Sequence, residues 1–225
     1  MRYNKKDIKQ SAQELLEEMP QDITVLAIAD GCSQTEIEAA LEAGITHVGH
    51  SQIGEVEPMI HALGKRAIWH MTGHMKSGQV KKTVQLFEMV DRLDSWNLAK
   101  RLDRRGRSKG KIISVLIEIK DGYRDSKTGI SFDSLEDFIL RMAVLQFVRV
   151  DGLMTPGLEE SDSEKNRRLY RAMRKAYESI IEMNRNHATM RYLSMGTSRD
   201  YHIALDEGAN MIRIGSKIFG PRHSE

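Results

Sequence analysis

Short apolar segments rich in β-branched residues alternate with longer segments of helical periodicity along almost the whole chain. The segments with the character of strands cover residues 23–29, 46–49, 67–72, 88–93, 112–119, 148–154, 191–194 and 211–215. Strands that alternate with helices in this way are typical of βα units, in which the strands form a parallel sheet. The pattern therefore predicts an α/β protein built from about eight such units.

Signals for the ends of helices fall between these strands. Gly44 and Gly208 stand where helices should end, because glycine adopts the left-handed conformation of a helix cap without strain. Three helices are expected to begin at a capping side chain that precedes a carboxylate by three residues, namely at Ser33/Glu36, Asp133/Glu136 and Ser161/Glu164.

A further amphipathic segment precedes the first strand. Its apolar residues recur at helical spacing, at Ile8, Ala12, Leu15, Leu16 and Met19. This stripe predicts an extra helix at the N-terminus. No linker, low-complexity tract or shift in composition divides the chain, so we expect residues 1–225 to form one domain.

Two arrangements can hold eight βα units, a closed barrel and an open, doubly wound sheet. The doubly wound fold that binds dinucleotides carries G-x-G-x-x-G after its first strand, whereas this chain reads Ala29-Asp-Gly-Cys-Ser33 there. The barrel is therefore favoured. We expect a single (β/α)8 barrel, a TIM barrel, with the extra helix before it, although 225 residues is near the small end of the range for this fold.

Composition excludes several classes of protein. Lys and Arg total 34 against 32 Asp and Glu, and a formal net charge of +2 gives no reason to expect nucleic acid or a membrane surface as partner. Cys32 is the only cysteine, which excludes an internal disulfide and a thiolate zinc cluster and fits a reducing compartment. Residues 1–10 are polar and resemble neither a signal peptide nor an anchor, so we expect a cytoplasmic protein. A monomer is expected, and no protein partner is indicated.

Candidate chemistry lies in the loops after the last two strands. Functional residues of a barrel lie at the C-terminal ends of its strands, and phosphate commonly binds between the loops after strands seven and eight. Here these loops read Ser194-Met-Gly-Thr-Ser198 and Arg213-Ile-Gly-Ser216. Small residues let backbone N–H groups approach a phosphate, and hydroxyls add donors. The structural alternative is that Ser198 caps a helix and Gly215 turns the chain, but the pair of loops at the expected strands favours a phosphate site.

At these loops the chain resembles the pyridoxal phosphate homeostasis protein family, which shares the fold of the N-terminal domain of alanine racemase. The strongest matching motifs are Leu193-Ser-Met-Gly-Thr-Ser198 with Asp200, and Met211-Ile-Arg-Ile-Gly-Ser216 through Ile218-Phe-Gly-Pro-Arg222. Weaker ones are Trp69-His70, Ser126-Lys-Thr-Gly-Ile130 and Gly152-Leu-Met154. The resemblance spans nearly the whole length and implies a barrel that binds pyridoxal phosphate.

The resemblance also implies a set of cofactor-binding residues. Ser198, Gly215 and Ser216 would hold the phosphate, and Arg213 would face the pyridine nitrogen. A permanently charged arginine there would keep that nitrogen unprotonated and make the ring a poorer electron sink. The other residues expected in contact with the cofactor or near it are Asp30, His50, Ser51, His70, Met154, Ser194, Gly196 and Thr197.

The chain departs from the family's pattern at the end of the first strand. The family reads L-A-V-S-K there, and its lysine forms an imine with the cofactor, whereas this chain reads Leu26-Ala-Ile-Ala-Asp30. A carboxylate cannot form an imine, so covalent attachment at this position is excluded. Lys76, Lys127 and Lys217 are substitutes in principle, but each is expected to be an ordinary surface lysine. We therefore expect a non-catalytic protein that binds pyridoxal phosphate, or a related phosphorylated ligand, noncovalently.

Two alternatives come from the same departures. The family's G-E-N after the second strand is Gly49-His-Ser51 here, and the next loop contains His74, so Asp30, His50 and His74 could form the metal site of a metal-assisted enzyme. In a milder form, Asp30 and His74 would only be hydrogen-bonded to each other. The second alternative is an interaction or regulatory protein that keeps the barrel without its ligand. Amino-acid racemase activity is not expected, because alanine racemase takes its other base from a C-terminal domain that this chain lacks.

Overall fold

Eight parallel strands close into a barrel in the computed structural model, which describes residues 3–120, 128–157, 163–183 and 188–221. Each strand pairs with its neighbours in sequence, and β1 also pairs with β8 to close the ring. The strands are β1 (Thr24–Ile28), β2 (His47–His50), β3 (Ile68–Met71), β4 (Met89–Leu93), β5 (Ile113–Glu118), β6 (Val148–Met154), β7 (Ala188–Thr197) and β8 (Met211–Ile214).

The closed ring confirms the predicted (β/α)8 barrel and excludes the doubly wound alternative, in which β1 would not pair with β8. All eight predicted strands are present, and seven of them agree with their predicted bounds to within one residue at each end. β7 is the exception, because it runs from Ala188 to Thr197 and not only over residues 191–194. Its pairing with β8 shifts register between Ser194 and Thr197, which carries the strand further into the mouth of the barrel.

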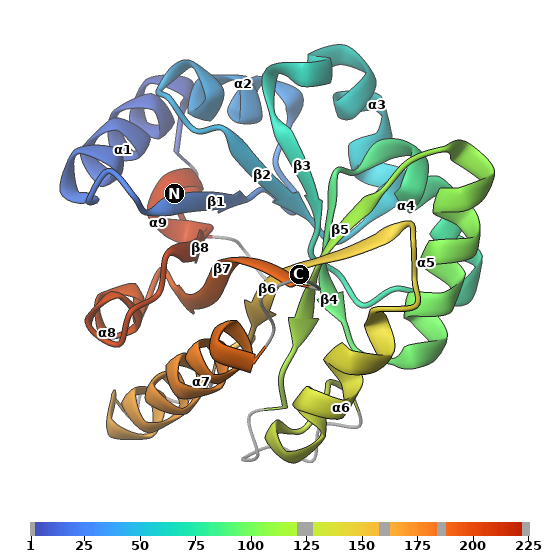
Figure 1. Ribbon diagram of the computed structural model, residues 1–225. Coiled ribbons are helices and arrows are strands. Elements are labelled where there is room, and N and C mark those ends of the chain that lie inside the picture. The colour runs from blue at the N-terminus through green and yellow to red at the C-terminus, as the bar shows by residue number, and fades with distance from the viewer. Residues whose placement is uncertain (1–2, 121–127, 158–162, 184–187, 222–225) are drawn as a thin grey trace.

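Helices surround the barrel on its outer side, as Figure 1 shows. They are α1 (Lys5–Glu18), α2 (Gln34–Glu42), α3 (Ile53–Leu63), α4 (Val80–Leu86), α5 (Trp96–Lys109), α6 (Phe132–Met142), α7 (Ser163–Met183), α8 (Tyr201–Asp206) and α9 (Ser216–Phe219). Short 3₁₀ turns cover Gly64–Arg66 and Ser77–Gln79. Across the described residues, no helix combines the length and apolar character needed to cross a membrane.

The predicted helix signals have mixed outcomes. Ser33 and Glu36 form the expected capping box at the start of α2. Gly44 and Gly208 follow the ends of α2 and α8 with positive φ angles of 110° and 89°, as predicted. The prediction for Asp133 is wrong, because the N-cap of α6 is Ser131, two residues earlier in the chain. The Ser161/Glu164 prediction depends on residue 161, which lies outside the described residues.

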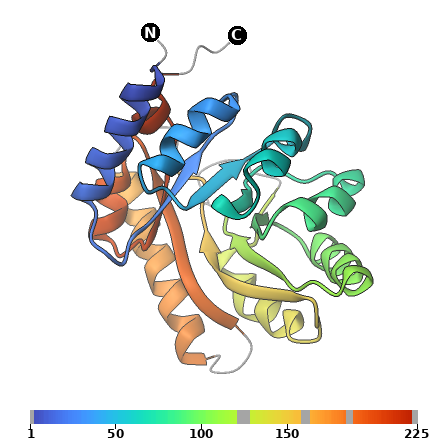
Figure 2. The ribbon, with the colours of Figure 1, turned by 90° about the horizontal axis from the view of Figure 1, so that it is seen from above.

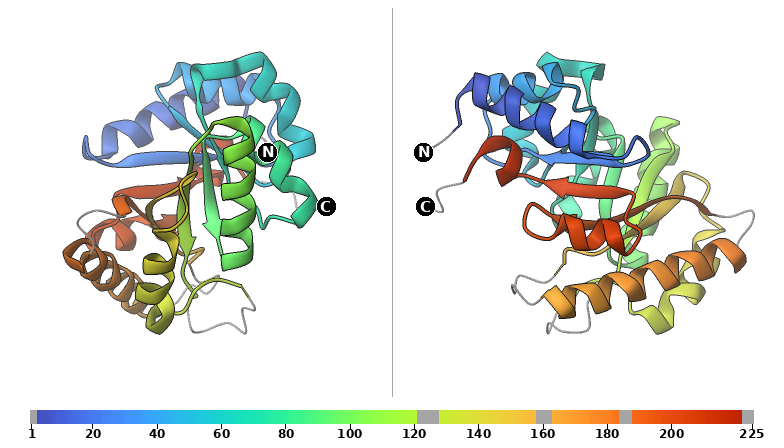
Figure 3. Two further views of the ribbon diagram at one scale, coloured as in Figure 1. Left: turned by 45° about the vertical axis from the view of Figure 1, so that its right-hand side comes forward. Right: turned by 90° about the vertical axis from the view of Figure 1, so that its left-hand side faces the viewer.

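The extra N-terminal helix is present as α1. Ile8, Ala12 and Leu15 of its predicted stripe are fully buried, so the helix packs against the barrel by one face. α1 lies beside α2 and α9, as Figures 2 and 3 both show. The first and last described helices are therefore neighbours on one side of the barrel.

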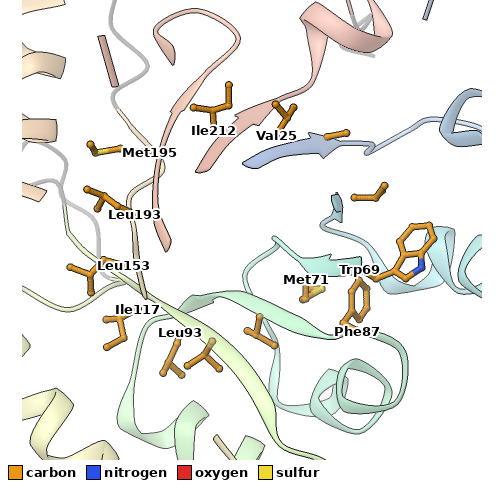
Figure 4. Packing of buried hydrophobic residues seen from close by; sticks show 14 of the residues in the cluster. Val25, Trp69, Met71, Phe87, Leu93, Ile117, Leu153, Leu193, Met195 and Ile212 are labelled. Atoms are coloured by element: carbon orange, nitrogen blue, oxygen red, sulfur yellow. The ribbon is translucent and has the colours of Figure 1, made fainter. Parts of the chain in front are cut away.

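Two separate sets of buried apolar residues stabilise this architecture. The larger set lies between the strands and the surrounding helices, and Figure 4 shows part of it, including Trp69 against Phe87. The smaller set fills the inside of the barrel and contains Leu26, Met89, Leu116, Met154 and Met211. Because side chains alternate between the two faces of a strand, Val25 and Ala27 join the outer core while Leu26 points inward.

One glycine lets strands β6 and β7 approach each other closely. At Gly152 the β6 register shifts, the φ angle is +156°, and a Cβ atom would lie 1.9 Å from the backbone oxygen of Tyr192 in β7. No side chain fits at that distance, so the close approach requires glycine.

We predict that Gly152→Ala lowers the free energy of unfolding by about 3 kcal/mol or more, because the backbone of β7 has to move away. Equilibrium denaturation in urea measures this loss. Gly54→Ala is the matched control, since a Cβ at Gly54 in α3 meets nothing within 4 Å. That control should be neutral or stabilising by up to about 1 kcal/mol, and equal losses in the two variants would contradict the explanation.

Candidate functional site

A cavity of about 830 Å³ opens at the C-terminal ends of the strands, in the mouth of the barrel. Its size is in the range of pockets that bind small molecules. Most of the predicted cofactor-binding residues lie on its wall, namely Asp30, Ser51, Met154, Thr197, Ser198, Arg213, Gly215 and Ser216. His74, which the sequence analysis considered as a metal ligand, also lies on the wall. The remaining wall residues were not predicted from the sequence, and they are Ile28, Thr72, Gly73, Arg92, Pro156, Arg199 and Pro221.

The loops after β7 and β8 contact each other directly through Ser198. Its Oγ accepts the backbone N–H of Gly215 at 3.2 Å and that of Lys217 at 3.4 Å. The alternative in which Ser198 caps the helix that follows it is wrong, because the N-cap of α8 is Asp200. We call Ser198, Gly215 and Ser216 the β7–β8 cradle. It presents hydroxyls and backbone N–H groups at one end of the cavity.

A buried carboxylate holds the β7 loop in place. Asp200 accepts the backbone N–H and the hydroxyl of Thr197 at 2.7 and 2.8 Å, and the hydroxyl of Tyr170 at 2.5 Å. Burial, followed by the hydrogen bond to Asp200, raises the pKa of Tyr170 far above its ordinary value, so this phenol stays a donor. Hydrogen bonds among Tyr170, Asp200 and Thr197 thus hold the loop that carries Ser198.

Arg213 lies at the floor of the cavity and is almost completely buried. Its Nη2 donates to the backbone oxygen of Thr155, and its Nη1 lies 3.8 Å from the sulfur of Met154. Burial lowers the pKa of Arg213 from its ordinary value, although a guanidinium keeps its charge in proteins. Within the described residues no carboxylate forms an ion pair with it, so a cation faces the cavity from below.

Asp30 follows β1 at the rim of the same cavity. Its Oδ1 accepts the backbone N–H of Ser51 at 2.6 Å and lies 3.3 Å from Nδ1 of His50. Nδ1 of His74 lies 3.0 Å from Oδ2 of Asp94, and the Asp30–His74 hydrogen bond stays a prediction. In the part of the chain that the structure describes, no three His, Cys, Asp or Glu side chains converge as metal ligands, and the Asp30, His50 and His74 set is therefore not formed.

Arg92 and Glu118 form a bidentate ion pair on the inner side of β4 and β5. Nε and Nη2 of Arg92 donate to the two carboxylate oxygens at 2.9 and 2.6 Å, and Glu118 is almost fully buried. This pairing raises the pKa of Arg92. The sequence analysis missed Arg92, because its partner is remote in sequence. The only available signal was its position near the C-terminal end of a predicted strand.

Four predicted residues lie away from the cavity wall. His50 and Ser194 are fully buried beneath the rim. Gly196 packs on α8, where a Cβ would lie 2.6 Å from the Cβ of Ala204. His70 lies deeper in the barrel, with its Nε2 2.8 Å from Nδ1 of His47 and its Nδ1 2.8 Å from Oδ1 of Asp91. In the described structure these four support the wall and do not form it.

Comparison with known proteins agrees with this geometry. The family model described as "Alanine racemase, N-terminal domain" matches residues 5–223. The pyridoxal phosphate homeostasis protein of Synechocystis sp. is 30% identical over 214 residues, which are 93% of this chain and 96% of that protein. The chain belongs to the pyridoxal phosphate homeostasis protein family. The family member of Escherichia coli strain K12 is 28% identical over 90% of this chain and 87% of its own.

Solved structures of similar proteins have the same barrel. PipY of Synechococcus elongatus PCC7942 without PLP superposes with a TM-score of 0.89 at 26% identity, covering 95% of this chain and 100% of that one. PipY with PLP bound gives a TM-score of 0.86 at 25% identity over the same shares. Alanine racemase of Corynebacterium glutamicum, at 15% identity and a TM-score of 0.79, shares the fold over 62% of its length.

This family member has no lysine on the described wall of its cavity. Lys217 turns outward, where its Nζ donates to Glu18 at 2.9 Å and to the hydroxyl of Tyr201. Lys76 is exposed at the start of the 3₁₀ turn Ser77–Gln79. Lys127 lies outside the described residues. Neither of the two described substitutes for the family's lysine reaches the cavity.

We predict that the stability of this barrel falls in mild acid because of His47. Burial, with a smaller contribution from His70, lowers the pKa of His47 to about 4 from an ordinary value of 6.5. The unfolded chain therefore takes up the proton first, so the stabilisation is complete above about pH 6.5 and is lost as the pH falls toward 4. The free energy of unfolding should drop by roughly 2 kcal/mol between about pH 7.5 and pH 5.

Urea denaturation at the two pH values measures this drop. The variant His47→Gln removes the titrating group and should lose most of the pH dependence. A variant as sensitive to acid as the natural chain would show that another group causes the effect.

Proposed function

We propose that this chain is a non-catalytic protein that binds a vitamin B6 5′-phosphate noncovalently in the mouth of its barrel. The observation that carries the proposal is one cavity with the β7–β8 cradle at its edge, the Arg213 cation at its floor, and Asp30 at its rim. Pyridoxal phosphate is the ligand bound to PipY, which has the same barrel. A closely related phosphorylated ligand would use the same contacts.

The cradle fits the phosphate group. The hydroxyls of Ser198 and Ser216 are available donors, and the N–H groups of Gly215 and Lys217 converge on one oxygen, the Oγ of Ser198. A phosphate oxygen could replace the Oγ of Ser198 as the acceptor of one of these two backbone N–H groups. The wall carries more arginine than acidic side chains, which also favours an anion.

The floor fits the pyridine ring. A guanidinium that already donates to Thr155 has further N–H groups, and a ring nitrogen facing Arg213 would accept one. When bound, pyridoxal phosphate supplies an aldehyde and an electron-withdrawing ring. An arginine at the ring nitrogen keeps that nitrogen unprotonated and weakens the withdrawal of electrons, so Arg213 favours storage of the ligand over carbanion chemistry.

The residues of the described wall support noncovalent binding. Asp30 cannot form an imine, and no lysine of the described chain lines the cavity. The ligand would thus be held only by the cradle, by Arg213 and by the shape of the cavity. A protein of this kind releases its ligand without a chemical step, which suits a reservoir or carrier.

We predict that borohydride reduction of the protein mixed with pyridoxal phosphate leaves no adduct in the cavity. Mass spectrometry of the reduced, digested protein checks this. Asp30→Lys should restore covalent attachment, seen as a yellow absorbance band and a reduced adduct on the introduced side chain. Asp22→Lys, at the exposed opposite end of β1, is the matched control and should give neither signal. A folded Asp30→Lys variant with no adduct would count against an intact pocket.

We predict that replacing both Ser198 and Ser216 with alanine weakens the binding of pyridoxine 5′-phosphate by roughly tenfold or more, because two donors to the phosphate are lost. Calorimetric titration measures the affinity. The double variant Ser131→Ala with Ser134→Ala removes two hydroxyls near the start of α6, outside this cavity, and should bind normally. Unchanged affinity in the first variant would remove the cradle from the site.

A further inference from the structure

A second cavity, of about 320 Å³, lies outside the barrel, where the 3₁₀ turn Ser77–Gln79 and the start of α4 face helix α5. α4 and α5 lie side by side in Figure 1. No described residue lines both this cavity and the mouth of the barrel. We call it the α4–α5 cavity, and its described lining consists of Ser77, Gly78, Val80, Lys81, Arg101, Arg104, Arg105 and Ser108.

The described lining of the α4–α5 cavity combines four cations with no carboxylate. In the described chain none of the four has an acidic partner. Other cations of the same two helices do have one, since Arg107 of α5 lies 4.0 Å from Asp103 and Lys82 of α4 lies 2.6 Å from Glu57. Positive charge is therefore gathered at this cavity and is not neutralised there.

Three of the four cations share one face of α5. Arg101 is followed by Arg104 and Arg105 three and four residues later, and like charges at this spacing destabilise a helix. The helix dipole does not offset the repulsion, because its effect is confined to the last turn, which contains Arg107 and Lys109. An anion bound between the three arginines would offset it.

Arg105 is held in place and has an unused donor. Its Nη1 donates to Oγ of Ser108 at 3.2 Å, and the hydroxyl of Ser108 donates to the backbone oxygen of Arg105 at 2.9 Å. Its Nε is buried and has no acceptor in the part of the chain that the structure describes. A buried donor without a partner is rare in proteins, and a bound ion is one of its ordinary explanations. This donor is an indication of an anion that does not depend on the count of charges.

The dimensions of the cavity indicate the class of anion. Its volume is at the lower end of the range for pockets that bind small molecules, which favours a small ligand over a macromolecule. The row from Arg101 to Ser108 rises roughly 10 Å along α5, and Lys81 faces it from α4. A single phosphate group is too short to contact cations along the whole row. Two or more linked phosphate groups extend further and carry more charge.

We propose that the α4–α5 cavity is a second anion site, which binds small anions with two or more linked phosphate groups. Arg105 donates its Nε–H to one phosphate, and the side chains of Arg101, Arg104 and Lys81 bind the oxygens that remain. The site shares no described wall residue with the mouth of the barrel, so the inference does not rest on the proposed function.

Calorimetric titration of the full-length chain with inorganic pyrophosphate and with orthophosphate tests the proposal. Pyrophosphate should bind at least about tenfold more tightly, because it contacts more of the cations. Arg101→Gln with Arg104→Gln removes two exposed cations of the cavity and should weaken pyrophosphate binding by about tenfold or more. Lys100→Gln with Lys109→Gln is the matched control, since it removes the same charge from exposed positions of α5 outside the cavity. Its affinity should stay within roughly twofold, because salt screens exposed charges.

Two further variants locate the anion. Arg105→Lys keeps the positive charge but removes the guanidinium with its buried Nε donor, and it should weaken pyrophosphate binding by roughly fivefold. Urea denaturation checks that this variant is folded. Replacing both Ser198 and Ser216 with alanine changes the mouth of the barrel only and should leave pyrophosphate binding as it is in the natural chain.

Each contrary outcome overturns the inference. Equal affinity for pyrophosphate and orthophosphate, or no binding of either, excludes a site for linked phosphates. Equal losses in the two double variants of α5 show that net charge attracts the anion and that the cavity does not. Loss of pyrophosphate binding in the variant of Ser198 and Ser216 places the anion in the mouth of the barrel. The proposed function is measured with pyridoxine 5′-phosphate, so these outcomes leave it standing.

Discussion

The pairing of β1 with β8 is the contact on which the candidate site depends. It closes the barrel and brings the end of the first strand next to the end of the last one, with Ala27 opposite Ile214. Only in a closed ring do Asp30 and the β7–β8 cradle become neighbours on one wall. An open sheet would leave β1 and β8 without this contact, and the two halves of the site would be separate.

Arg213 differs from two other arginines of the barrel strands in the groups that it contacts. Arg149 is paired with Asp151, and Arg92 with Glu118, each by two hydrogen bonds. A buried charge without a partner is costly, so paired charges are the ordinary solution. Arg213 has a backbone oxygen and a sulfur as its described contacts and faces the cavity. Arg213 is thus a buried cation on the described wall of the cavity.

Asp30 stands at the rim of the cavity, where the resemblance in sequence places a lysine in the family. The described wall keeps the cradle, the Arg213 floor and the Asp200 network that supports the β7 loop. A covalent anchor selects a ligand by its reactive aldehyde, whereas a fixed carboxylate selects by charge and hydrogen bonding.

The sequence by itself determined the eight strands, the extra helix and the barrel, because hydrophobic period and glycine position are local properties of the chain. It also indicated the β7–β8 cradle, because small and hydroxyl residues follow two predicted strands. It misjudged the start of α6, where Ser131 takes the N-cap position in place of Asp133. Only the tertiary structure decided the contacts between distant residues, such as Arg92 with Glu118, His70 with His47, and Ser198 with Gly215. Strand register sets which side chains meet inside a barrel, and register depends on packing between strands that no single stretch of sequence contains.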